Sequence, residues 1–247
     1  MKNRLPIVVL TVLAVATLIV GPSAIGAADP PVTEHITILH TSDLHGAVLP
    51  FNDFANRPSD RGSLAQVATM VDEIRAGTDH PVVLLDSGDT LQGSSLEQFV
   101  HVRWGEPSPT IDAMNRMGYQ AMAVGNHEFN FGLGVLRRAE AQAVFPFLSA
   151  NSLLVDTDEP AFPPYLVVGA GDVRIGVLGL TTPNVPGWEK AENYAGLYFQ
   201  PMDEAARLGV PVLRDTEGCD LVVVIAHTGF EVDTETGEPN GLSLIHI

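Results

Sequence analysis

Six polar side chains stand directly after four apolar stretches of the sequence, and all six are of types that bind metal ions. They are Asp43 and His45 after residues 36–41, Asp89 after 82–86, Asn126 and His127 after 121–124, and His227 after 221–226. Carboxylate oxygens, amide oxygens and imidazole nitrogens are ligands that suit Zn, Mn and Fe alike. Layered α/β proteins bind small molecules and ions outside the carboxyl ends of their strands. Four strand ends would therefore bring these six side chains to one site.

Each piece alone has an ordinary structural explanation. Asp43 and His45 fit a turn aspartate beside a surface histidine, and Ser-Gly-Asp at 87–89 fits a tight turn. His227 fits a buried histidine at a strand end. The Asn-His-Glu run at 126–128 is more specific, because a plain turn needs only one such side chain. The four coincidences together favour a metal site.

The elements that must position these residues alternate along the chain. We expect strands at 36–41, 82–86, 121–124, 147–150 and 221–226, a hairpin of 165–168 with 173–180, and helices at 63–75, 96–103, 110–117, 134–143 and 202–213. Short apolar runs that alternate with segments of helical period are typical of a layered α/β domain. No internal repeat or low-complexity linker interrupts the pattern, so it predicts one domain.

Composition excludes several classes of protein. The 247 residues include 30 acidic and 13 basic side chains, and the formal net charge is -17 at pH 7. Binding of a nucleic-acid polymer depends on Lys and Arg, so this balance argues against it. The single cysteine, Cys219, excludes an intrachain disulfide and any two-cysteine metal or redox motif.

Residues 1–28 have the three parts of a secretory signal peptide. Lys2 and Arg4 precede an apolar run at 5–20, and the small residues GPSAIGAA follow. The run is shorter than the about 20 residues that cross a bilayer, so a membrane anchor is the second interpretation. The sequence therefore predicts export to the periplasm, cell envelope or medium, with no stable membrane anchor.

The ordered motifs resemble those of the calcineurin-like metallophosphoesterases. Within these they resemble the exported 5'-nucleotidase family, which includes UDP-sugar hydrolases and 2',3'-cyclic-nucleotide phosphodiesterases. The motifs are ITILHTSDLHG, LLDSGDTLQGSSL, DAMNRMGYQAMAVGNHEFNFG, FPFLSAN, RIGVLGLTTP and VVVIAHTG. The resemblance implies an α/β fold of two β-sheets sandwiched by helices. It also implies that Asp43 and His45 bind one divalent metal, Asn126 and His227 a second, and that Asp89 bridges both.

The resemblance further implies the chemistry. His127 matches a catalytic histidine that meets the phosphoryl group without binding metal. Two divalent ions, of Zn, Mn or Fe, activate a water and stabilise the oxygens of an in-line displacement. The substrate would be a small phosphate ester, foremost a nucleotide. His40 and Glu128 are candidates for supporting roles, His40 as a buried hydrogen-bonding residue and Glu128 as a group that orients Asn126 or His127.

Two departures from the family pattern bear on activity. The family usually has Asp where this chain has Asn130, beside the catalytic histidine, and the sequence alone therefore suggests that Asn130→Asp raises activity. The family also completes its metal site with a later Gly-His-x-His or Gly-His-x-Gln segment, which does not follow His227 here.

These features lead to a domain assignment and to alternatives. We expect a partial catalytic domain at 29–240, a non-native tail at 241–247, and no C-terminal substrate domain in this chain. The leading prediction is an exported two-metal phosphohydrolase. Its alternatives are an exported metal-binding or interaction protein with little turnover and a sulfur-compound hydrolase of a sibling branch.

Overall fold

The main sheet has four parallel strands in the order β1-β4-β5-β6. A computed structural model of the protein describes residues 33–53, 55–59, 62–229 and 236. The strands are β1 (Thr37–Thr41), β4 (Val82–Asp86), β5 (Ala121–Ala123) and β6 (Phe147–Leu148). Parallel neighbours require crossover connections, and here helices supply them.

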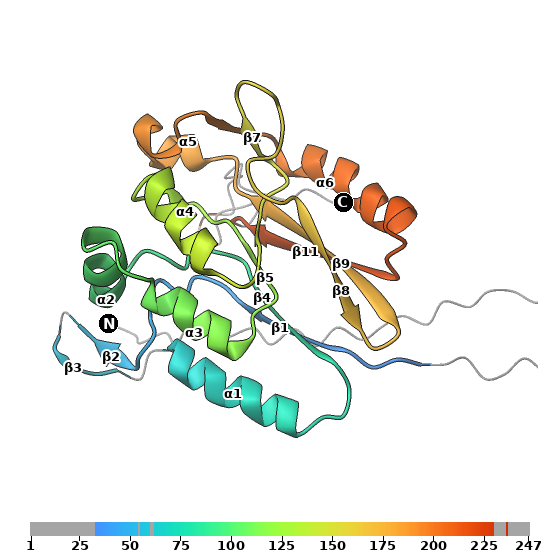
Figure 1. Cartoon of the computed structure of the whole chain (residues 1–247), viewed down its shortest axis with the longest axis horizontal. Helices are drawn as coiled ribbons and strands as arrows, with labels where there is room; N and C mark the ends of the chain where they lie inside the picture. Colours follow the sequence, from blue (N-terminus) through green and yellow to red (C-terminus); the bar gives the residue numbers. More distant parts are fainter. Residues whose placement is uncertain (1–32, 54, 60–61, 230–235, 237–247) are drawn as a thin grey trace, which may run out of the picture.

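Three helices cover one face of this sheet (Figure 1). They are α1 (Leu64–Ala76), α3 (Pro109–Met117) and α4 (Leu133–Gln142). α3 has clear local signals at both ends: the Ser108 side chain accepts from the backbone N–H of Ile111, and Gly118 ends the helix at φ 73°. Leu84 and Met122 of the sheet pack into the apolar core beneath these helices.

The other face of the main sheet packs against a second sheet. That sheet has the order β11-β9-β8 and consists of β8 (Tyr165–Ala170), β9 (Val173–Thr181) and β11 (Leu221–His227). Val83 and Leu85 alternate with Leu84 along β4, so they point to the opposite face and meet Val177 and Ile225 of the second sheet. A third core lies between the second sheet and α6 (Met202–Pro211), where Leu178 and Leu180 pack against Ala206.

The resulting order of layers is helices, sheet, sheet, helix, which confirms the expected α/β fold of two sheets sandwiched by helices. Shorter elements complete the described structure. They are β2 (Phe51–Asn52), β3 (Arg57–Pro58), α2 (Ser95–Glu97), η1 (Gln98–Arg103), η2 (His127–Phe129), β7 (Ser152–Leu154), α5 (Val185–Trp188), η3 (Ala191–Tyr194), β10 (Leu197–Phe199) and η4 (Val212–Thr216).

The expected elements all occur, most of them within two residues of their expected ends. The helix expected at 96–103 is three residues of α-helix followed by the wider π-helical turn η1, and the helix expected to end at 213 gives way to the π-helical turn η4 after Pro211. The small pairs β2-β3 and β7-β10 were not expected, because segments of two or three residues carry no periodic signal. None of the helices among the described residues has the length and hydropathy that crossing a bilayer needs. The predictions for residues 1–28 and 241–247 lie outside the described residues.

Candidate metal and phosphoester site

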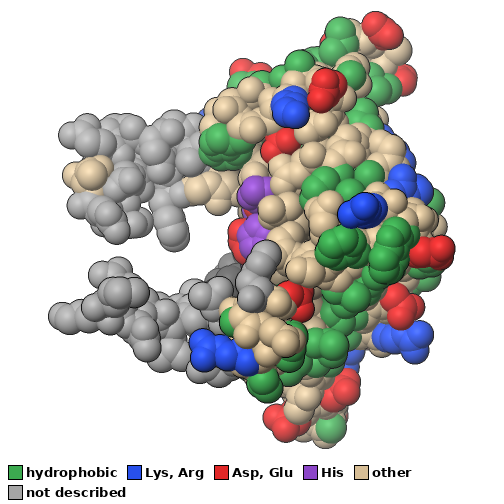
Figure 2. Space-filling view, turned by 90° about the vertical axis from the view of Figure 1, so that its left-hand side faces the viewer, with side chains coloured by type: hydrophobic (Ala, Val, Ile, Leu, Met, Phe, Trp, Pro, Cys, Tyr) green, Lys and Arg blue, Asp and Glu red, His purple; other side chains and the backbone are tan. Residues whose placement is uncertain are grey.

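All seven residues predicted for the site lie at the carboxyl ends of β1, β4, β5 and β11. They are Asp43, His45, Asp89, Asn126, His127, Asn130 and His227. Figure 2 shows histidine side chains next to acidic side chains at the surface of one face of the molecule. The two sheets therefore bring residues as far apart in sequence as Asp43 and His227 to one place.

The loop after β1 is hydrogen-bonded to the loop after β4. The backbone N–H of Asp43 donates to the carbonyl of Gly88 (3.0 Å), and that of His45 donates to the carbonyl of Asp89 (2.9 Å). Asp43, His45 and Asp89 adopt left-handed backbone conformations, with φ of 55°, 48° and 58°. Such conformations are uncommon outside glycine, although Asp and His are enriched among the exceptions. Three candidate ligands thus stand on constrained backbone of the kind that gathers at functional sites.

Two glycines allow the loops after β4 and β5 to touch. A Cβ at Gly88 would lie 2.5 Å from the backbone nitrogen of Gly125, and φ at Gly88 is +92°. A Cβ at Gly125 would lie 2.4 Å from Oδ1 of Asp89. Any side chain at either position would push Asp89 away from the residues that follow β5.

Asp89 is the centre of a buried group of hydrogen bonds. Its Oδ1 accepts from the backbone N–H of His127 (2.8 Å), and its Oδ2 lies 3.0 Å from Nε2 of His227. The same Nε2 lies 3.1 Å from Oδ1 of Asn126. Asp89 is thus placed between the two ring nitrogens of His127 and His227, at 3.8 and 3.0 Å from Oδ2.

The two histidines predicted to bind metal are oriented by backbone carbonyls. Nδ1 of His45 lies 2.8 Å from the carbonyl oxygen of Gln92, and Nδ1 of His227 lies 2.9 Å from that of Ser87. Because a carbonyl oxygen only accepts, Nδ1 carries the proton in both rings and Nε2 faces the site. Metal-binding histidines in proteins are commonly fixed in this way.

This donor set fits a divalent cation. In the neutral ring, the Nε2 lone pair of His227 faces two oxygens that are also acceptors, on Asp89 and Asn126. Three acceptor atoms that converge are compatible with one another only if a proton or a cation lies between them. A group of atoms from Asp43, His45 and Asp89, all within 4.8 Å of one another, offers a second place for an ion.

Burial and charge shift the pKa values of the buried pair in opposite directions. Burial opposes protonation of His227, but the hydrogen bond and charge of Asp89 outweigh it and raise the pKa of His227 to about 9. Burial also disfavours the Asp89 anion, yet its contacts with His227 and His127 lower the pKa of Asp89. In the absence of metal, the pair is therefore an imidazolium with a carboxylate.

The other half of the site is more exposed. The side chains of Asp43 and His45 are 55% and 38% exposed, and the Nε2 of His45 lies 3.8 Å from Oδ1 of Asp43. The rings of His45 and His127 meet edge to face at 5.3 Å between centroids. His127 thus lies between the two groups of candidate ligands.

Glu128 has a different role from the expected one. Its buried carboxylate accepts from four backbone N–H groups, those of Asp89, Thr90, Leu91 and Gly125, at 2.6 to 3.1 Å. It therefore joins the loop after β4 to the loop after β5, whereas the sequence suggested that it orients the side chains of Asn126 or His127. His40 also differs: its Nε2 is hydrogen-bonded to Oγ of Ser87 at 2.6 Å, but the residue is exposed.

Asn130 contacts His127 as the sequence suggested, and a further acid lies behind it. Oδ1 of Asn130 lies 2.7 Å from Nδ1 of His127, while its Nδ2 donates to Oε1 of Glu189. Asn193 donates to Oε2 of Glu189 (3.1 Å) and to the main-chain oxygen of Asn130 (3.0 Å). Sequence reasoning missed Glu189, because it lies 59 residues from Asn130 and on no recognisable local motif.

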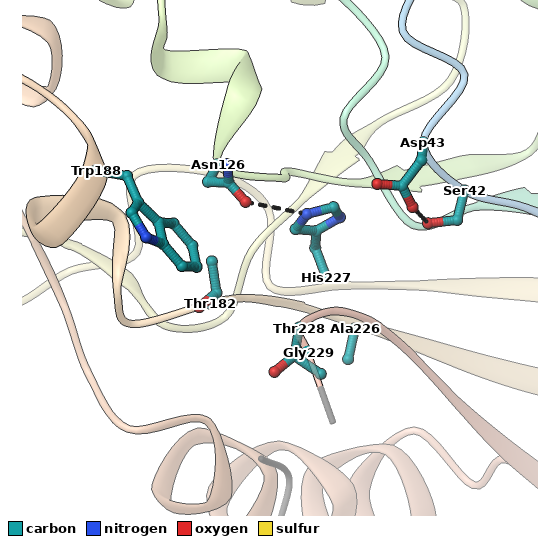
Figure 3. A pocket seen from close by; sticks show the side chains of 9 residues that line it. All are labelled: Ser42, Asp43, Asn126, Thr182, Trp188, Ala226, His227, Thr228 and Gly229. Atoms are coloured by element: carbon teal, nitrogen blue, oxygen red, sulfur yellow. Dashed lines mark hydrogen bonds between the residues drawn. The ribbon is translucent and has the colours of Figure 1, made fainter. Parts of the chain in front are cut away.

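A pocket of ≈ 240 Å³ opens beside the buried candidate ligands Asn126 and His227 (Figure 3). Asn126 and His227 point toward each other in it, and the indole of Trp188 lies on the other side of Asn126. Trp188 is 50% exposed, at the end of α5 whose first residue, Val185, is fully buried. Thr182 and Thr228 also line the pocket. Sequence reasoning did not single out Trp188, since one tryptophan after Pro-Gly carries no motif.

Comparison with known proteins identifies relatives of the chain. It is 34% identical over 213 residues to a 2',3'-cyclic-nucleotide 2'-phosphodiesterase/3'-nucleotidase of Yersinia enterocolitica, which covers 81% of this chain and 32% of the relative. It is also 36% identical over 211 residues to the protein UshA of Escherichia coli. That match covers 83% of this chain and 36% of UshA. The crystal structure of a putative 5'-nucleotidase from Staphylococcus aureus superposes with a TM-score of 0.71 at 32% identity and covers 83% and 39% of the two chains.

The chain thus spans about a third of the length of these curated relatives. The match to the family named calcineurin-like phosphoesterase runs over residues 36–243 and includes every site residue described above. This protein belongs to the calcineurin-like phosphoesterase family.

Proposed function

We propose that the protein is an exported, metal-dependent phosphohydrolase that hydrolyses a phosphate ester of a nucleotide or related compound. The observation that carries this proposal is the convergence of Nε2 of His227, Oδ2 of Asp89 and Oδ1 of Asn126, with Asp43 and His45 alongside. The names of the relatives, which are phosphodiesterases and nucleotidases, support phosphate esters over sulfur compounds.

The positions of the candidate ligands divide them between two ions. Asp43 and His45 would hold one divalent ion, Asn126 and His227 the second, and Asp89 would contribute to both because it lies between the two groups. A pair of divalent ions supplies an activated water and charge stabilisation for the attacking and leaving oxygens. Zn, Mn and Fe all suit this set of oxygen and nitrogen ligands.

His127 would act on the substrate itself. Its Nδ1 is held by Asn130, so Nε2 faces the space between the two groups of ligands. A proton on Nε2 in the charged ring can stabilise the phosphoryl oxygens or pass to the leaving oxygen. The ring is 35% exposed, which leaves it open to a ligand, whereas Asp89 behind it is 5% exposed.

The exposed position of Trp188 favours a substrate that carries an aromatic base, such as a nucleotide. Its exposed indole lines the pocket that also contains Asn126 and His227. Stacking of a base on an aromatic side chain contributes about 1–3 kcal/mol. Trp188→Ala should therefore raise KM for adenosine monophosphate by about 5-fold to 150-fold, with a much smaller effect on glycerol phosphate.

Hydrolysis and metal binding together test the proposed activity. The chain is freed of metal with a chelator and titrated with Mn²⁺ or Zn²⁺ while the release of phosphate from 4-nitrophenyl phosphate, adenosine monophosphate and a 2',3'-cyclic nucleotide is measured. We expect turnover that rises with bound metal and disappears in Asp89→Asn. Metal binding without turnover would favour a binding protein, and turnover of thiosulfate-type compounds alone would favour the sulfur branch.

Export is a separate part of the proposal. It rests on the signal-like pattern of residues 1–28, and the expected mature protein begins near Asp29. N-terminal sequencing of the secreted protein tests it. An intact Met1 on a membrane-bound product would contradict cleavage.

A further inference from the structure

The amide of Asn130 has two different neighbours. Its orientation decides whether an acceptor oxygen or a donor N–H faces Nδ1 of His127. Oδ1 faces Nδ1 of His127 at 2.7 Å, and Nδ2 faces the carboxylate of Glu189. Because amide oxygen only accepts, Nδ1 of His127 must carry a proton in this arrangement. If the amide turned over, its N–H would face Nδ1 and the ring proton would move to Nε2.

Glu189 is the group that prevents this reversal. Both of its carboxylate oxygens accept hydrogen bonds, Oε1 from Nδ2 of Asn130 and Oε2 from Nδ2 of Asn193. A carboxylate has no hydrogen to donate, so only the NH₂ side of Asn130 can face it. Asn193 also donates to the main-chain oxygen of Asn130 at 3.0 Å, which ties the segment carrying Glu189 to the turn that carries His127.

We propose that Glu189 is a positioning residue that acts on His127 through Asn130. It holds the amide so that Nδ1 of the ring keeps its proton, and Nε2 is then the nitrogen that faces the substrate and gains or gives the second proton. The proposal rests on the proposed function for the role of His127. It also accounts for Asn130 itself: an amide between a ring N–H and a carboxylate can accept from one and donate to the other, whereas an aspartate there would place two carboxylates against each other.

Exchanging the amide at position 130 and the carboxylate at position 189, first singly and then together, tests this arrangement. In Glu189→Gln, one acceptor must serve the N–H groups of both Asn130 and Asn193, so the amide of Asn130 loses its single orientation. We expect kcat to fall by about 10-fold to 100-fold with KM little changed. Asn130→Asp alone should lower kcat as well, because its carboxylate would face that of Glu189. This is the reverse of what the sequence alone suggested.

The double variant Asn130→Asp with Glu189→Gln should recover most of the lost kcat. The carboxylate introduced at position 130 would accept from Nδ1 of His127 and from the new amide N–H at position 189, while the amide oxygen at position 189 would accept from Asn193. Recovery in the double variant would show that the losses in the two single variants are coupled through this pair of residues. Glu192→Gln, the same chemical change at an exposed position in η3, is the matched control and should leave kcat unchanged.

A spectroscopic measurement on the metal-free chain separates this proposal from the proposed function. Long-range ¹H–¹⁵N spectra distinguish the two neutral tautomers of a histidine ring. We expect the Nδ1–H form of His127 in the protein and in the double variant, and a mixture or the Nε2–H form in Glu189→Gln. An unchanged tautomer in Glu189→Gln, or losses of kcat that simply multiply in the double variant, would overturn the proposal. A chain without turnover that shows the expected tautomers would refute the hydrolase and retain the role of Glu189.

Discussion

The two halves of the site differ in how deeply their side chains are buried. Asp89 and His227 are 5% and 11% exposed, and each is fixed by hydrogen bonds to the protein. Asp43 and His45 are 55% and 38% exposed and lie on the left-handed turn after β1, where Nδ1 of His45 is hydrogen-bonded to the carbonyl of Gln92. Protein atoms therefore surround the candidate ligands of the buried half, whereas one side of Asp43 and His45 faces solvent.

The largest expected effect comes from breaking the support of the buried half. In Glu128→Gln, an amide group would replace a carboxylate oxygen that accepts backbone N–H groups, and at least one buried donor would face another donor. We expect the free energy of unfolding to fall by roughly 2–5 kcal/mol, measured by urea denaturation of the metal-free chain.

The control for this prediction is Glu73→Gln, the same change on the exposed face of α1. It should alter the free energy of unfolding by less than about 0.5 kcal/mol. Equal effects of the two substitutions would show that Glu128 does not join the loops after β4 and β5.

The pH dependence of the free energy of unfolding should give the next largest effect, and it should come from the buried half. The pKa of His227 is raised from 6.5 to about 9, so the imidazolium stabilises the metal-free protein fully below pH 6.5 and loses this contribution as the pH rises through 9. The lowered pKa of Asp89 acts at the other end, because its contribution is lost only as the pH falls through its folded value. Between pH 6.5 and 9.5, the free energy of unfolding should therefore fall by roughly 3 kcal/mol.

Urea denaturation at several pH values, with a chelator and then with saturating Mn²⁺, measures this dependence. Bound metal should remove most of the slope, since the cation replaces the proton between His227 and Asp89. His227→Gln should also lack the slope in the presence of chelator. A slope of the same size in His227→Gln would assign it to other groups.

The smallest pair of effects compares one carboxylate from each half. Asp89→Asn should lower the metal-free free energy of unfolding by about 1–3 kcal/mol, because the N–H of His127 and the ring of His227 lose a charged partner. Asp43→Asn should change it by less than about 0.5 kcal/mol, because asparagine tolerates the same left-handed conformation. Both variants should bind Mn²⁺ more weakly by calorimetry. Equal losses of metal-free stability would remove the distinction between the halves.

Strand ends were predictable from the sequence, and the groups that orient the side chains on them were not. β4 occurs over the residues expected, because an unbroken apolar run such as 82–85 is too short for a helix and is typical of a strand buried on both faces. The carbonyls of Ser87 and Gln92 that fix His227 and His45 depend on the paths of loops, which no periodicity records.

The supporting acids show the same limit. The sequence marked Glu128 as a supporting residue from its place beside His127, but its partners are backbone N–H groups of another loop. Glu189 could be recognised only after the fold had brought it to Asn130. Long-range hydrogen bonds between side chains are set by tertiary packing, and one sequence does not contain a signal for them.

The left-handed backbone under Asp43, His45 and Asp89 also limits how this site can change by mutation. Apart from glycine, the residues enriched in that conformation are Asn, Asp and His, so a cysteine or glutamate would have to bear backbone strain before it could offer its own ligand atom. The codons of Asp, Asn and His differ from one another only in the first base. Single-base changes at these positions can therefore exchange carboxylate, amide and imidazole, the three kinds of candidate ligand atom, while the loop keeps its shape.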